Sequence, residues 1–146
     1  MTLRPLALLF LLSACETTPA TDSPPPANAM IEVASGSFFG SSATQIFADG
    51  RIIQFTGAPG HAPTQVAQQG TPDAYTAAAA VIAAEGRHTK ATQKIHAEQC
   101  LDYGSDSVRA VPPIGGFDGV STGCPDAAVT ALMDHVLSSL ATKNVP

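Results

Sequence analysis

The segment at residues 125–142 constrains the fold most, because it predicts a helix that has to bury one side. Six of its apolar residues follow the period of an amphipathic α-helix: Val129, Leu132, Met133, Val136, Leu137 and Leu140. The opposite side is polar and carries Asp126, Thr130, Asp134 and Ser138. A helix of this kind is stable mainly through packing of its apolar face. The rest of the chain therefore has to supply an apolar surface for it.

Residues 30–34 alternate between apolar and polar and predict a β-strand. Residues 43–48 and 51–56 also have the composition of strands. Asp49 and Gly50 between the last two predict a tight hairpin, because glycine accepts the positive φ that such turns require. With a two-residue turn, Ile46 would lie opposite Ile53. Ile46, Ile53 and Phe55 would then share one face of the sheet.

Thr71, Pro72 and Asp73 predict the start of a first helix. Threonine can cap the helix, proline fits the first turn, and the aspartate carboxylate suits the positive end of the helix dipole. Residues 74–85 are mostly alanine, and Gly86 is expected to end the helix.

The remaining segments are less regular. Residues 35–42 and 57–70 are rich in turn-forming residues and are expected to be loops. For residues 87–99 a loop, a short helix and an irregular strand all stay open. Residues 107–111 and 119–121 predict a second hairpin. Strands followed by helices favour a single small α+β domain, with a mainly antiparallel sheet packed with two helices.

The first residues have the order of a secretory signal. Arg4 precedes the uninterrupted apolar run of residues 6–12, and the small residues Ser13 and Ala14 follow. The run is too short to cross a bilayer, which takes about 20 apolar residues. Residues 1–14 are therefore expected to be a signal peptide that is removed.

Leu-Ser-Ala-Cys at residues 12–15 resembles the lipobox of bacterial lipoproteins. The resemblance implies that the Cys15 sulfur carries a diacylglycerol and that the new amino terminus is acylated. Residues 15–29, rich in proline and threonine, would be a flexible tether, and residues 30–146 the globular domain. Glu16, where inner-membrane lipoproteins often have aspartate, favours the periplasmic face of the outer membrane, with the inner membrane and the cell surface left open.

Lipidation of Cys15 leaves Cys100 and Cys124. In an oxidising periplasm such a pair predicts a disulfide. The alternative is a reactive thiol at Cys124, since a helix N-terminus stabilises a thiolate. The two cysteines lack the Cys-x-x-Cys spacing of a redox motif, which favours the structural bridge.

The other polar residues show no spacing that identifies a catalytic site, and neither a metal nor a cofactor is expected. The histidines have none of the short spacings of a metal site; they are His61, His88, His96 and His135. Turn formation is favoured over calcium binding for Asp102, Asp106 and Asp118. The sequence contains no glycine-rich phosphate loop.

Charge and composition limit the classes of molecule that the protein is expected to bind. Loss of Arg4 with the signal changes the formal charge from −5 to −6, which argues against nucleic acid as a partner. The adjacent Phe38 and Phe39 suggest a partner surface. The sequence therefore predicts a non-catalytic binding or envelope-assembly module with an envelope protein or glycan as partner. The alternative is a small periplasmic enzyme, or an inhibitor of one, with its site at 57–70 or 87–99.

Overall fold

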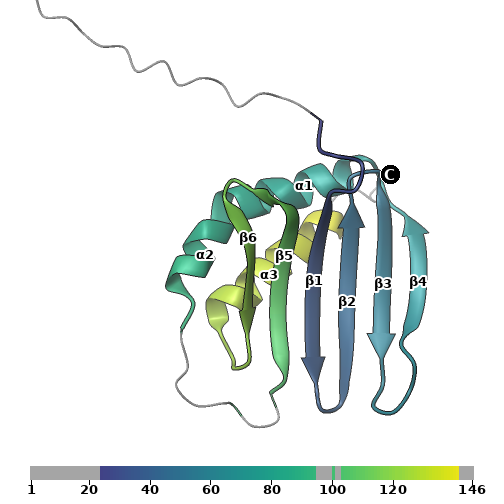
Figure 1. Ribbon diagram of the computed structural model, residues 1–146, viewed down its shortest axis with the longest axis vertical. Helices are drawn as coiled ribbons and strands as arrows, with labels where there is room; N and C mark the ends of the chain where they lie inside the picture. The colour runs from purple at the N-terminus through teal and green to yellow at the C-terminus, as the bar shows by residue number, and fades with distance from the viewer. Residues whose placement is uncertain (1–23, 95–99, 101–102, 142–146) are drawn as a thin grey trace, which may run out of the picture.

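A computed structural model describes residues 24–94, 100 and 103–141 of the chain. Its elements are β1 (Met30–Ser37), β2 (Gly40–Phe47), β3 (Arg51–Gly57), β4 (Thr64–Gln69), α1 (Asp73–Val81), the π-helical turn η1 (Ile82–Gly86), α2 (Arg87–Thr92), β5 (Ser105–Ile114), β6 (Phe117–Thr122) and α3 (Ala127–Ala141). The strands form one antiparallel sheet in the order β4-β3-β2-β1-β5-β6 (Figure 1). The predicted α+β class with a mainly antiparallel sheet is confirmed.

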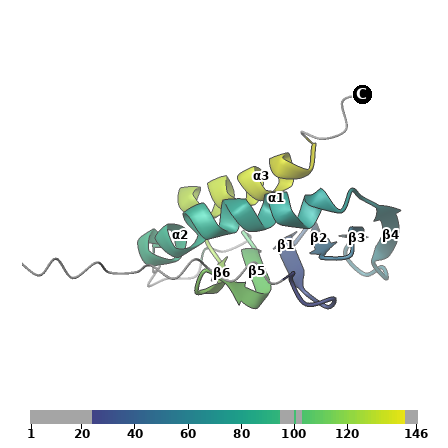
Figure 2. The same ribbon diagram turned by 90° about the horizontal axis from the view of Figure 1, so that it is seen from above.

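The helices lie together on one side of the sheet and leave its other face open (Figure 2). Helix α1 continues through η1 into α2, and this continuous segment packs beside α3, with both in contact with the sheet. The core lies between them and the sheet. Its largest fully buried side chains are Phe117, Ile31, Ile46, Ile82, Leu132, Val108, Val129 and Val136.

The register of the β2–β3 hairpin corrects the prediction for its apolar residues. Ile46 lies opposite Ile52, not Ile53. The connecting loop has three residues, and the Gly50 amide donates to the Phe47 carbonyl oxygen at 3.0 Å with Gly50 at φ +88°. The extra loop residue shifts the pairing by one position, so Ile53 and Phe55 lie on the open face while Ile46 faces the helices.

Both segments predicted as loops contain strand. Residues 35–42 are strand except for a two-residue turn at Phe38 and Phe39. The predicted surface loop at 57–70 contains β4, and only residues 58–63 connect it to β3. All six residues of β4 are exposed. An edge strand of this kind needs no apolar alternation, so the sequence pattern gave no sign of it.

The predicted end of the first helix at Gly86 is also wrong. Gly86 has helical backbone angles, φ −57° and ψ −46°, and the chain continues as α2 to Thr92. A Cβ atom at Gly86 would lie 2.8 Å from Cγ of Phe117. The glycine therefore allows Phe117 to pack against the helix backbone. Residues 87–92, left open by the sequence, are helical.

Candidate functional site

Cys100 and Cys124 are placed as the sequence predicts. Their sulfur atoms lie 2.11 Å apart and their Cα atoms 5.1 Å apart. The pair joins the segment before β5 to the connection between β6 and α3. Cys124 is buried, and its amide donates to Oγ1 of Thr122 at 3.2 Å. The pair can thus form a disulfide, which favours the structural role over a reactive thiol. Cys15 lies outside the described residues.

Asp126, which the sequence pattern placed on the polar side of the last helix, is 4% exposed and caps α3. Its Oδ1 accepts from the amides of Ala128 at 3.0 Å and Val129 at 3.2 Å, and its Oδ2 accepts from the amide of Lys94 at 2.9 Å. The hydrogen bond from the Lys94 amide, with those from the helix amides, lowers the pKa of Asp126. The carboxylate links the chain just after α2 to the start of α3.

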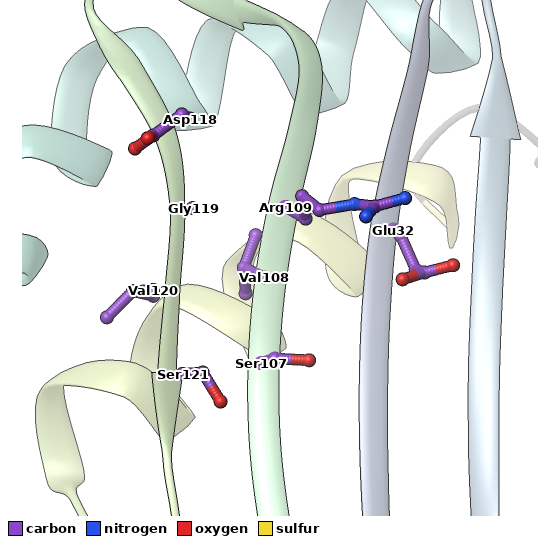
Figure 3. Close-up of a pocket in the computed structure, with 8 residues that line it drawn as sticks. All are labelled: Glu32, Ser107, Val108, Arg109, Asp118, Gly119, Val120 and Ser121. Atoms are coloured by element: carbon purple, nitrogen blue, oxygen red, sulfur yellow. The ribbon is translucent and has the colours of Figure 1, made fainter.

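A hollow of about 520 Å³ lies on the sheet at β1, β5 and β6 (Figure 3). Arg109 and Glu32 are cross-strand partners, and Figure 3 shows the guanidinium group extending toward β1 beside Glu32. Oε2 of Glu32 also accepts from Nε2 of Gln45 at 2.7 Å. On the other side of Arg109 lies Gly119, whose missing side chain leaves the space.

Glu32 and Asp118, two of the charged residues at this hollow, each have a hydrogen-bond partner. Asp118 pairs with Nζ of Lys90 at 2.5 Å, and this hydrogen bond lowers the pKa of Asp118. The described residues that line the hollow include two serines, Ser107 and Ser121, but no histidine or cysteine. A serine nucleophile needs an adjacent general base, usually a histidine, and the described lining of this hollow contains no histidine.

An aromatic tip, defined here as Phe38 and Phe39, projects from the β1–β2 turn. The two residues are 74% and 80% exposed, and their ring centroids lie 5.7 Å apart in an edge-to-face arrangement. A hollow of about 200 Å³ separates the turn from the loop at residues 58–63, which contains His61. The aromatic tip lies at the opposite end of β1 from residues 24–29, where the chain enters the sheet (Figure 1).

The remaining predicted residues do not come together. His88 is exposed on α2, while Nδ1 of His135 on α3 lies 2.8 Å from Oε2 of Glu85. Asp106 accepts from the Tyr103 hydroxyl at 2.5 Å. His96 and Asp102 lie outside the described residues. Among the residues that the structure describes, no three potential ligands of the histidine, cysteine or carboxylate type form a metal site.

None of the helices in the described part of the chain combines the length and apolar content that crossing a bilayer requires. Comparison of the chain with protein-family models, with curated proteins and with solved structures found no significant match.

Proposed function

We propose that this protein is a lipoprotein held at the periplasmic face of the outer membrane through Cys15, and that its domain is a non-catalytic binding module for another envelope protein. The proposal joins two independent features. The lipobox-like residues 12–15 and the proline-rich segment after them support a tethered protein. The aromatic tip supports a binding role.

The exposure of the aromatic tip is the observation that carries the binding role. Two adjacent phenylalanines in contact with solvent contribute little to the core and leave apolar surface in water. Aromatic side chains are enriched at the centre of protein–protein interfaces, where they become buried on binding. The residues around the tip, 35–37 and 40–44, are all uncharged. This composition favours a protein partner over an anionic one.

The tether is compatible with access to such a partner. Residues 15–23, the part of the predicted tether that precedes the described residues, would span about 28 Å at the 3.1 Å per residue of an extended proline-rich chain. Ala29, at the end of the predicted tether, is buried in the core. The tether joins the domain at the end of β1 that is remote from the aromatic tip. The eight residues of β1 separate the attachment point from the tip by about 26 Å, so the tip lies at the end of the domain that is remote from the attachment point.

The alternative, a small periplasmic enzyme or enzyme inhibitor, depended on a pocket with two or more titratable groups at 57–70 or 87–99. In the described part of these segments, the hollow beside residues 58–63 has one such group in its lining, His61. The binding module is therefore the better supported of the two proposals.

Site-specific photo-crosslinking in intact cells tests the binding role. A photoreactive residue at Phe38 or Phe39 is expected to capture a defined envelope protein, while one at Val111, an exposed apolar residue of β5, is not. The Phe38→Ser/Phe39→Ser variant should lose the partner in co-purification, whereas Val111→Ser should keep it. Equal capture from the tip and from Val111 would contradict the proposal, as would retention by peptidoglycan in place of a protein.

A further inference from the structure

Strand β4 leaves one edge of the sheet unprotected. All six of its residues, Thr-Gln-Val-Ala-Gln-Gln, are exposed, and they include neither a charged residue nor a proline. Natural sheets usually protect an edge with charges, prolines, bulges or a covering element. Among the described residues, none donates to or accepts from the outer side of β4.

The opposite edge of the sheet, strand β6, is protected by neighbouring side chains. Strand β6 is bordered by α2, with Lys90 paired to Asp118. Nε2 of Gln93 also donates to the carbonyl oxygen of Ser121, so a side chain occupies a backbone acceptor of the strand. The two edges therefore differ, and β4 is the one that can accept another strand.

The outward-facing backbone groups of β4 can be assigned. The amide of Gly70, just after β4, donates to the Gly50 carbonyl oxygen at 2.9 Å and so points toward β3. Backbone groups in an antiparallel ladder alternate in direction at successive residues. Gln65, Ala67 and Gln69 therefore direct their N–H and C=O groups away from β3, to the free edge.

We infer that two copies of this chain pair through antiparallel β4 strands, with a two-fold axis at Ala67, to form a continuous twelve-stranded sheet. A two-fold axis perpendicular to the sheet would relate the two antiparallel β4 strands. Directly opposite side chains in such a pair share a face of the sheet, so one residue has to lie opposite its own copy at the axis. Centring on Ala67 makes all three outward-facing residues hydrogen-bonded pairs, Ala67 with itself and Gln65 with Gln69. Centring on Val66 would leave Gln69 without a partner.

A second copy is the occupant that the charges favour. Residues 52–72 contain no Asp, Glu, Lys or Arg, although the chain as a whole carries a formal charge of −5. The charged residues that border this segment are Arg51, which forms a 2.7 Å ion pair with Asp49, and Asp73 in the first turn of α1. Two acidic molecules can therefore meet at this edge with little repulsion between like charges.

Apolar surface beside β4 supports the same pairing. Val66 is 54% exposed on the side of the sheet that carries the helices. Next to it is a groove of about 500 Å³ between β3, β4 and the end of α3, with Ile52, Leu137 and Leu140 in its lining. Pairing at Ala67 sets Val66 opposite Gln68 of the second copy and joins the two grooves across the axis.

Cysteine crosslinking of the full-length protein in membranes tests the register. In Ala67→Cys the two introduced thiols belong to a hydrogen-bonded pair with Cα atoms about 5.5 Å apart, within the range of a disulfide. Mild oxidation is expected to yield a reducible dimer. Gln65→Cys alone should not crosslink, because its copies lie about 13 Å apart along the strands, but it should crosslink to co-expressed Gln69→Cys. Ser121→Cys on β6 is the matched control.

A second measurement uses the association itself. Ala67→Lys places two ammonium groups opposite each other and should weaken dimerisation by at least about tenfold in analytical ultracentrifugation, while Ser121→Lys should leave it unchanged. Circular dichroism checks that both variants fold. A monomeric parent protein would overturn the inference, as would equal crosslinking from Ala67→Cys and Ser121→Cys, or capture of a different protein at position 67. None of these outcomes depends on the aromatic tip.

Discussion

Removal of the Cys100–Cys124 bridge is the perturbation whose magnitude the structure fixes best. The two cysteines are 24 residues apart in sequence, and the loop that they close contains the β5–β6 hairpin. Cys100→Ala opens this loop in the unfolded chain. Because Cys124 is buried, the double variant Cys100→Ala/Cys124→Ala also removes the unpaired thiol that the single variant leaves in the core.

The expected loss follows from the entropy of the unfolded chain. A loop of this length corresponds to about 3.5 kcal/mol at 25 °C in the chain-entropy model. Domains of ordinary size have a total free energy of unfolding of about 5–15 kcal/mol. The bridge should therefore account for a large part of the stability of this domain, and the variants should unfold at a much lower urea concentration.

Urea denaturation followed by circular dichroism measures this loss, with the parent protein in dithiothreitol as the matched reduced state. The reduced parent and the double variant are expected to show the same lowered midpoint. If the free energies of unfolding of the oxidised parent and the double variant agreed within about 0.5 kcal/mol, the account of the bridge would be wrong. Two free thiols in the unreduced protein would refute it as well.

Substitutions at two further positions test the helix contacts. Asp126→Ala should lower the free energy of unfolding by about 1–2 kcal/mol, because it removes the acceptor for three backbone amides. Since folding lowers the pKa of Asp126 below 3.8, its ionised form stabilises the fold fully above that pH, and the contribution is lost as the pH falls through the folded-state pKa. Asp126→Asn should keep much of the cap, and its free energy of unfolding should fall less in acid than that of the parent protein. Equal dependence on pH in the two proteins would contradict the role assigned to the Asp126 carboxylate. Gly86→Ala should destabilise by about 1–3 kcal/mol in thermal unfolding, despite the better helix propensity of alanine, because its Cβ would overlap the Phe117 ring; a gain in stability would refute the packing argument.

The elements that bury one face were predictable from the sequence. Helix α3 buries Val129, Leu132, Met133 and Val136, four residues of its predicted stripe. The spacing of these residues follows the helical period because only one side of α3 packs against an apolar surface. The second hairpin also buries one face, since Val108 and Val120 lie opposite each other and are both buried.

The errors arose where long-range contacts decide the local structure. Nothing near Gly86 in the sequence indicates that the ring of Phe117 packs against it. The β2–β3 loop has one residue more than predicted, which places Ile53 on the other face of the sheet. The turn residues alone do not determine the length of the loop. At the candidate site, the cysteine pair follows from the cysteine count and the predicted periplasmic compartment. The partner of Asp126, the Lys94 amide, lies 32 residues away in sequence and has no local signal.

Mass spectrometry of the intact protein extracted from membranes tests the proposed lipid anchor most directly. The account predicts a chain that begins at Cys15, lacks residues 1–14 and carries the added mass of a diacylglycerol and an amino-terminal acyl chain. Cys15→Ser should abolish this mass increase. A chain that retains residues 1–14, or one that salt alone releases from membranes without any acyl mass, would contradict the account.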